Sequence, residues 1–167
     1  MDQEDGSWSG TSDKSLIATA FYANSVAILI KSLKVLGEDS GEYERLYQGI
    51  CKAFHHTFPK CRTQTECVLV LCFGLAKEPK KLAAQLAEMV RSNGNKLTTG
   101  FLGTPYLLYA LSENGYVKTA YDLLLQTETP SWLFSVRMGA TTMWEHWDSK
   151  KEDGTFWSSE MNSFNHY

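Results

Sequence analysis

The chain has 167 residues, 43% of them hydrophobic, and this size and composition fit one globular domain with a substantial core rather than a disordered segment. The formal net charge is -3 at pH 7 and the Lys and Arg residues are scattered, which argues against a nucleic acid partner because no basic stripe is available to bind phosphates. The apolar run from Cys67 to Phe73 is too short to cross a membrane and the acidic start lacks signal-peptide character, so we expect no membrane association and, for the chain as written, a cytoplasmic location.

The first predicted hairpin pairs a buried helix with an exposed one. A helix is expected over residues 13–36, with Ser12 or Asp13 as N-cap and Gly37 as the stop. Its apolar residues extend almost all round the helix, so we expect it to be buried on most sides. A second helix over about residues 40–58 keeps its apolar residues on one face and its charges on the other, which is typical of an outer, amphipathic helix.

The same alternation recurs twice further along the chain. Apolar helices are predicted over residues 64–73 and 105–112, and amphipathic helices over residues 79–92 and 117–126. The remainder is predicted to form loops, with only a brief helical turn near residues 140–144. Three such hairpins predict a single all-α domain in which inner and outer helices form part of a toroid, or alternatively a superhelical repeat.

The four cysteines do not form a metal-binding pattern. Cys51, Cys61, Cys67 and Cys72 lack both a CxxC spacing and partner histidines at the intervals of zinc ligands. His55 and His56 lie together near the end of a predicted helix, where imidazoles interact favourably with the helix dipole. We therefore predict free structural thiols, no metal site and no cofactor.

Aromatic and polar residues gather near the C-terminus. Trp144 and Trp147 flank Glu145, and Trp132 and Trp157 lie nearby in the sequence. A carboxylate between indole rings is typical of a carbohydrate site, because sugar C–H faces stack on Trp while carboxylates and imidazoles bind hydroxyls. The alternative is that the indoles cover the end of a helical core and Glu145 is a solvated surface residue.

Six segments in order along the chain resemble bacterial α-L-rhamnosidases. They are Ser15-Leu16-Ile17-Ala18-Thr19-Ala20-Phe21-Tyr22, Thr63-Gln64-Thr65, the run from Leu97 to Leu108, Pro130-Ser131-Trp132-Leu133, the run from Gly139 to Asp148, and Met161-Asn162-Ser163-Phe164-Asn165-His166-Tyr167. The resemblance covers almost the whole chain. It implies a six-hairpin glycosidase fold, of which this chain would form half of an (α/α)6 toroid with a sugar pocket at one end.

The resemblance also implies roles for individual residues toward a rhamnose-containing glycoside or oligosaccharide. Glu145 matches the general base that activates water, and His166 matches a histidine near the bound rhamnose. The expected sugar-binding residues are completed by Trp144, Trp147, Trp132 and Trp8. Trp8 follows Gly6-Ser7, where Ser7 stands in place of the Asp that is usual in the family.

Inverting hydrolysis needs a second carboxyl group as general acid. The family carries this acid upstream, in a segment that residues 1–12 do not match, and it continues beyond the His-Tyr pair into a closing helix. We therefore expect residues 1–167 to be a partial barrel with little or no activity alone. Two alternatives are a non-catalytic helical interaction module and a homodimer, in which two half-barrels pair through their exposed flanks.

Other polar groups have structural interpretations. Gly100, Gly103 and Pro105 lack the Lys-Ser or Lys-Thr pair of a phosphate-binding loop, so we interpret them as a turn before a helix. Asp148 and Asp153 could bind sugar hydroxyls, but turns are the favoured interpretation for both.

Overall fold

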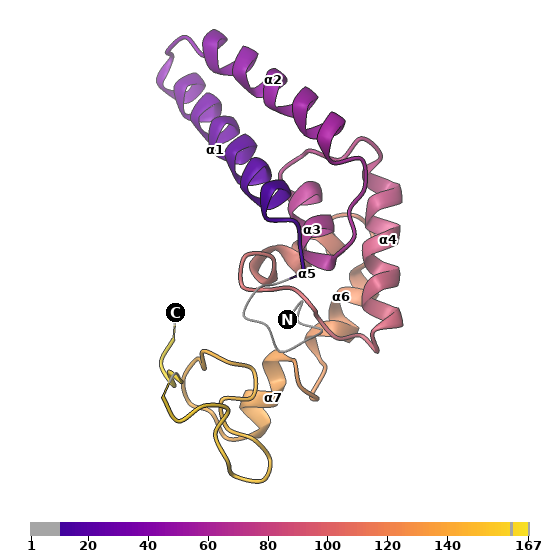
Figure 1. Ribbon diagram of the computed structural model, residues 1–167, viewed down its shortest axis with the longest axis vertical. Helices are drawn as coiled ribbons and strands as arrows, with labels where there is room; N and C mark the ends of the chain where they lie inside the picture. The colour runs from indigo at the N-terminus through magenta and orange to yellow at the C-terminus, as the bar shows by residue number, and fades with distance from the viewer. Residues whose placement is uncertain (1–10, 161, 167) are drawn as a thin grey trace.

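The protein is a set of helical hairpins followed by a loop-rich C-terminal segment. The computed structural model describes residues 11–160 and 162–166. Within these ranges the helices are α1 (Lys14–Leu36), α2 (Gly41–Thr57), α3 (Gln64–Cys72), α4 (Pro79–Ser92), α5 (Thr104–Ser112), α6 (Val117–Leu124) and α7 (Trp132–Arg137) (Figure 1). No strand occurs there, apart from an isolated antiparallel bridge between Lys150 and Phe156. The all-α prediction is confirmed.

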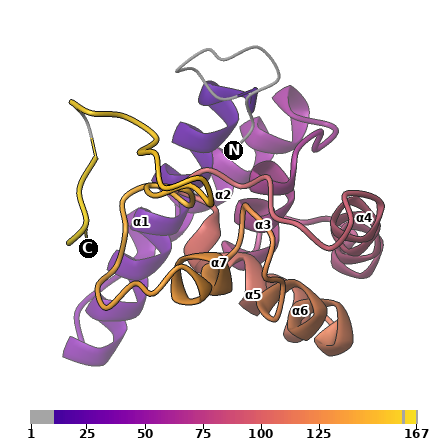
Figure 2. The ribbon, with the colours of Figure 1, turned by 90° about the horizontal axis from the view of Figure 1, so that it is seen from below.

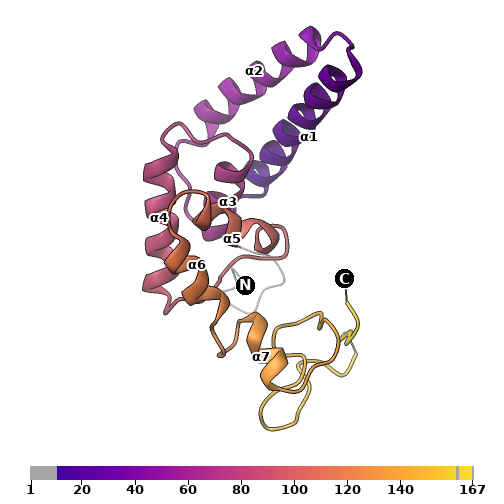
Figure 3. The same cartoon turned by 180° about the vertical axis from the view of Figure 1, so that it is seen from behind.

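The helices alternate between an inner and an outer position. Each odd-numbered helix packs against the even-numbered helix that follows it, α1 packs against α3, and α3 packs against α5. The outer helices α4 and α6 also contact each other, and they lie on one side of the hairpin stack in the view from behind (Figure 3). The inner and outer roles predicted from the apolar patterns are therefore confirmed for α3 to α6, whereas α1 packs against α3 without the predicted burial.

Helix α3 is the centre of the core. Every residue from Gln64 to Val70 is buried. Cys67 and Val68 pack into a cluster shared with α4, α5 and α6, whereas Leu69 and Val70 pack into a second cluster with α1 and α2. Through these two clusters the short helix joins the neighbouring hairpins. Full burial of each Val or Leu side chain in them stabilises the fold by about 1.5–3 kcal/mol.

Local sequence signals set the helix ends. The Asp13 carboxylate caps α1 by accepting hydrogen bonds from the backbone N–H groups of Ser15 and Leu16 at 2.8 and 3.2 Å. Gly37 ends α1 in the left-handed conformation with φ 74°, which glycine adopts without a steric penalty. Pro79 starts α4, where its missing N–H costs nothing.

Burial of α1 differs from the prediction. Only Leu16, Ala20, Ala23 and Val26 are buried, because α2 and α3 cover one side of the helix and no described element covers the other.

The sequence argument about membranes also considered the wrong segment. Among the described residues, α1 is long and apolar enough to cross a membrane by length and composition alone. This is weak evidence, since core helices and signal sequences meet the same criterion.

The helical turn predicted at residues 140–144 is wrong. Residues 140–144 form no helix, and the helix of this region is α7, eight residues earlier. The Ser131 hydroxyl caps α7 by accepting a hydrogen bond from the N–H of Phe134 at 3.1 Å, and Gly139 ends the segment with φ 81°. In place of a helical bond, the Met143 carbonyl accepts a hydrogen bond from the backbone N–H of His166 at 2.8 Å.

The loops before the inner helices are joined at one end of the hairpins. The buried Glu66 carboxylate accepts hydrogen bonds from the backbone N–H groups of Asp13 at 2.9 Å and Arg62 at 2.6 Å, which links the start of α1 to the start of α3. The Gln64 side chain accepts from the N–H of Thr98 at 2.9 Å, and Lys96 donates to the carbonyl of Thr129 at 2.9 Å. The loop that follows Thr98 at this end also lines the pocket described below.

Candidate active site

Two segments of the C-terminal region lie side by side and carry the predicted site. The backbone N–H of Glu145 donates to the carbonyl of Ser163 at 2.9 Å, and the N–H of His166 donates to the carbonyl of Met143 at 2.8 Å. The Thr142 hydroxyl also donates to the carbonyl of Phe164. These contacts bring Glu145 and His166 together although they are far apart in sequence. In the view from below, this region forms extended loops beside α7 (Figure 2).

A pocket of about 790 Å³ lies next to this pair of segments. Five of the predicted site residues line it: Glu145, His166, Trp144, Trp147 and Trp132. Its other walls come from the loop over residues 99–104 and from α5 and α6. The sixth predicted residue, Trp8, lies outside the described residues. A concave surface with a carboxylate, an imidazole and indole rings has the composition of a small-molecule site.

The Glu145 carboxylate is held by one oxygen. Its Oε2 accepts a hydrogen bond from the backbone N–H of Ser163 at 2.8 Å. Its Oε1 has no hydrogen bond partner within the described residues, and the side chain is exposed at the pocket. One oxygen is thus fixed by the backbone while the other is free to accept a proton or a hydroxyl group from a ligand.

Aromatic pairs hold the indole rings around the carboxylate. Trp132 and Trp147 meet edge to face, with ring centroids 5.5 Å apart and planes at 84°. Trp144 makes the same kind of contact with Phe164, at 5.5 Å and 87°. Such pairs contribute about 0.5–1.5 kcal/mol beyond area burial. They restrict the rings to orientations in which each still lines the pocket.

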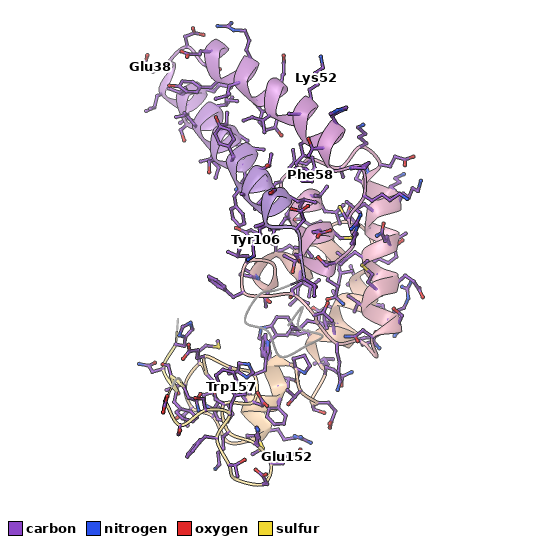
Figure 4. The ribbon with its side chains drawn as sticks, in the orientation of Figure 1. Glu38, Lys52, Phe58, Tyr106, Glu152 and Trp157 are labelled. Carbon is purple, nitrogen blue, oxygen red and sulfur yellow. The ribbon has the colours of Figure 1, made fainter. Side chains whose placement is uncertain are left out.

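A histidine that the sequence did not single out supports the loop that carries Glu145. The Nδ1 atom of His146 lies 2.5 Å from the carboxylate of Asp148, and its ring stacks on Trp157 with centroids 4.1 Å apart. Figure 4 labels Trp157 within the C-terminal loops. The Nε2 atom of His146 is buried without a hydrogen bond partner within the described residues. Asp148 therefore fixes the ring of His146 rather than a sugar hydroxyl.

Asp153, the second carboxylate for which the sequence allowed either sugar binding or a turn, stabilises a turn. It accepts hydrogen bonds from the N–H and the hydroxyl of Thr155 at 2.9 and 2.6 Å, and these bonds hold the pKa of Asp153 below its ordinary value. His55 has a structural contact as well, since its Nε2 lies 2.7 Å from the carbonyl of Leu75. No group of three or more potential metal ligands occurs among the described residues.

The glycine-containing loop before α5 forms one wall of the pocket. Gly100 accepts backbone hydrogen bonds from Gly103 and Thr104, both at 3.0 Å, which makes the segment a turn leading into the helix. A side chain at Gly103 would meet Thr65 of α3 at 3.2 Å, so the small residue permits close approach of the two inner helices. Phe101 projects from this turn with 85% of its surface exposed and lines the pocket, a role that sequence reasoning missed.

Comparison with known families decides the classification. The model for the bacterial α-L-rhamnosidase six-hairpin glycosidase domain matches residues 1–167. The chain belongs to this family. The sequence-based identification and the six-hairpin fold class are thereby confirmed.

Individual α-L-rhamnosidases resemble the chain closely over a limited part of their own length. The chain is 42% identical to an α-L-rhamnosidase of Formosa agariphila over 98% of this chain and 19% of that protein. An α-L-rhamnosidase of Streptomyces avermitilis is 40% identical over 97% of this chain and 17% of its own length. The chain therefore spans less than a fifth of these relatives.

Solved α-L-rhamnosidase structures share the fold. The crystal structure of the Streptomyces avermitilis α-L-rhamnosidase complexed with L-rhamnose superposes with a TM-score of 0.86 at 36% identity, over 95% of this chain and 17% of that one. The native Aspergillus terreus enzyme gives a TM-score of 0.87 at 34% identity, over 93% of this chain and 19% of that one. The hairpins described above are thus a rhamnosidase-type helical domain.

Proposed function

We propose that this chain forms the general-base side of an inverting α-L-rhamnosidase site and binds a terminal L-rhamnose unit. The observation that carries the proposal is the convergence of Glu145, His166 and three indole rings on one pocket in a domain of the rhamnosidase family. Crystallised relatives include one complexed with L-rhamnose. Glu145 is the one carboxylate that lines this pocket among the described residues.

The geometry suits Glu145 for activation of water. With Oε2 bound by the Ser163 N–H, the unpartnered Oε1 would accept the proton of a water whose oxygen attacks the anomeric carbon. Inversion requires a second, protonated carboxyl group at about 6.5–9.5 Å, on the opposite face of the sugar. In this proposal residues 1–167 are a partial barrel and another segment supplies that acid. The indoles would stack on the sugar and His166 would bind its hydroxyl groups.

Binding and turnover test separate parts of this proposal. Saturation-transfer NMR should show contact between the chain and methyl α-L-rhamnoside, a weaker contact with methyl α-L-fucoside, and loss of contact in Trp147→Ala. The exposed His56→Ala variant on α2 serves as a control and should bind like the unmodified chain. Absence of rhamnoside contact in the folded chain would refute the sugar pocket.

The hydrolysis assay addresses the missing acid. The chain alone should hydrolyse an aryl α-L-rhamnoside slowly or not at all, because loss of general-acid catalysis alone costs ~10²–10⁴-fold in rate. Robust turnover by the chain, abolished in Glu145→Gln, would show that the acid lies within residues 1–167 and would contradict the partial-barrel proposal while supporting the base.

A second proposal concerns self-association through α1. Tyr22, Leu29 and Leu36 are exposed and recur every seven residues, with Ile28 and Val35 beside them. A spacing of seven returns to nearly the same face of a helix, so these side chains form an apolar stripe along α1. Apolar patches of this kind mark interfaces. A second copy of the chain would cover the stripe, as in a toroid completed by two half-barrels.

A further inference from the structure

A second pocket lies between the end of α2, where Figure 4 labels Phe58, and the start of α4. Its volume is about 460 Å³, and no described residue lines both this pocket and the one that contains Glu145. Pockets of about 300–1,000 Å³ bind small molecules in other proteins. This pocket is therefore large enough for a small organic ligand.

Hydrogen bonds join the segments that enclose the pocket. The Nε2 atom of His55, near the end of α2, lies 2.7 Å from the carbonyl oxygen of Leu75, in the loop between α3 and α4. The Gln85 side chain of α4 donates to the carbonyl of Cys61 at 2.8 Å, which ties α4 to the connection between α2 and α3. All four residues line the pocket. Its walls are thus held by contacts within the protein, so a ligand would not have to order them.

Much of the lining is apolar and part of it is aromatic. Phe54, Val70 and Leu75 are buried, while Phe58 and Leu82 are half-buried and also line the pocket. The rings of Phe54 and Phe58 have centroids 5.1 Å apart and planes at 52°. Aromatic rings pack favourably on one another in offset or edge-to-face contacts. A ligand ring beside Phe58 would extend this pair and bury apolar surface.

The charged residues of the pocket are mostly positive. Lys60, Lys77 and Lys81 line it from exposed positions, and Glu78 is the one carboxylate among its described lining residues. Glu78 accepts a hydrogen bond from Lys81 at 3.2 Å, so these two charges neutralise each other. Lys60 and Lys77 have no ion-pair partner among the described residues. Two positive charges are therefore left for an anion, although the whole chain has a net charge of -3.

We propose that this pocket binds a small aromatic carboxylate, with the ring against Phe58 and Leu82 and the carboxylate between Lys60 and Lys77. Lysine side chains are long and flexible, so both ammonium groups can turn toward one anion. Exposed ion pairs alone contribute little to binding, and the apolar lining supplies the remaining affinity. The site is independent of the rhamnoside pocket and of Glu145.

A titration of the isotope-labelled whole chain with hydrocinnamate, followed by NMR, tests this site. Backbone amides of residues 54–61 and 75–85 should shift with a Kd of about 1 mM or below, and amides of residues 143–166 should not. Hydrocinnamide has nearly the same shape without the charge, and it should bind at least about threefold more weakly. Acetate has the charge without the ring and should bind more weakly still.

Variants remove the charge and the ring separately. Lys60→Gln combined with Lys77→Gln should weaken hydrocinnamate binding about threefold or more and leave hydrocinnamide binding unchanged. Phe58→Leu keeps an apolar side chain but removes the ring, so both ligands should bind more weakly. Lys14→Gln combined with Lys31→Gln removes two charges from exposed positions on α1 and is the matched control. This control should bind hydrocinnamate like the unmodified chain.

The two lysine variants change only exposed side chains, so they remain informative if circular dichroism shows that Phe58→Leu folds poorly. Absence of amide shifts around the pocket at about 10 mM hydrocinnamate would overturn the site. Equal affinity for hydrocinnamate and hydrocinnamide, or full affinity without the charges of Lys60 and Lys77, would overturn the preference for a carboxylate. Full affinity in a folded Phe58→Leu variant would overturn the contact with the ring.

Discussion

Glu145 and Ser163 exchange two hydrogen bonds, one in each direction. The N–H of Glu145 donates to the carbonyl of Ser163 at 2.9 Å, and the N–H of Ser163 donates to the carboxylate Oε2 of Glu145 at 2.8 Å. The first bond involves only backbone and survives any side chain at position 145, whereas the second depends on an acceptor there. The pair therefore separates the structural contribution of Glu145 from its chemical one.

Substitutions of Glu145 should follow this distinction. Glu145→Gln keeps a carbonyl acceptor for Ser163 but cannot take a proton, so we expect an unchanged melting temperature and weaker rhamnoside contact by NMR. Glu145→Ala removes the acceptor as well and should cost about 0.5–1.5 kcal/mol. Equal stability of the Ala and Gln variants in thermal unfolding would show that the Ser163 contact contributes nothing.

The pairing of Glu145 with Ser163 was beyond the reach of sequence reasoning, and the reason is physical. The helix ends at Asp13, Gly37 and Pro79 follow from local backbone chemistry, and the structure confirms them. Hydrogen bonds between two loops follow from no local periodicity. A helical turn was predicted at residues 140–144 because the local pattern does not reveal that this segment pairs with the one containing Ser163 and His166.

The predicted burial of α1 was wrong for a related reason. An apolar pattern shows which residues favour burial, but it does not say which neighbours are present to bury them. On α1 the pattern runs all round the helix, yet described neighbours cover one side and Val35 remains 88% exposed. On α3, where neighbouring helices pack around the helix, the same kind of pattern predicted burial correctly.

The His146 ring should control the order of the loops around the pocket. His146→Ala removes the contact with Asp148 and the stack on Trp157, so backbone amides in residues 143–166 should exchange faster with deuterium. The His146–Asp148 contact is half-buried, and a hydrogen bond that involves a charged group contributes about 1.5–3 kcal/mol. The amides of α3 should be unaffected, because the hairpin core does not include His146. The exposed His56→Ala variant is the matched control. Unchanged exchange in His146→Ala would contradict the supporting role.

Glu66 should be the carboxylate whose loss costs the most stability. It is 2% exposed and accepts hydrogen bonds from two backbone N–H groups, those of Asp13 and Arg62. Glu66→Ala leaves both donors without their acceptor, and we expect a loss of about 2–4 kcal/mol in unfolding free energy. The exposed Glu88, which pairs with Arg91 one helical turn away, is the control and should lose about 0–1 kcal/mol on replacement by Ala. Similar losses at both positions in urea unfolding would refute the link between α1 and α3.

The first hairpin should show a pH-dependent contribution from Glu44. Lys34 at the end of α1 donates to the Glu44 carboxylate at 2.7 Å, and Ser40 donates at 3.0 Å, so the pKa of Glu44 lies below its ordinary value. A depressed folded-state pKa stabilises the protein fully above the unfolded-state value, and this stabilisation is lost as the pH falls through the folded-state value. Glu44→Gln should therefore melt slightly below the unmodified chain at pH 7.

The two melting temperatures should converge at pH ~2, where the Glu44 carboxyl group is protonated in both the folded and the unfolded chain. They should also converge in high salt, since the ion pair is exposed. A difference that persists at low pH would mean that the Gln side chain disturbs packing instead.

Self-association through α1 gives the last prediction. If the exposed stripe is an interface, light scattering over a concentration series should show the mass per particle rising toward twice the chain mass, because burial of Ile28 and Leu29 removes apolar surface from water. Ile28→Glu combined with Leu29→Glu places charges within the stripe and should hold the chain as a monomer with unchanged helix content. Gln48→Glu, an added charge at an exposed position on α2, should leave association intact. A strict monomer at high concentration would leave the stripe without a second copy to cover it, and the paired half-barrel would have to be abandoned.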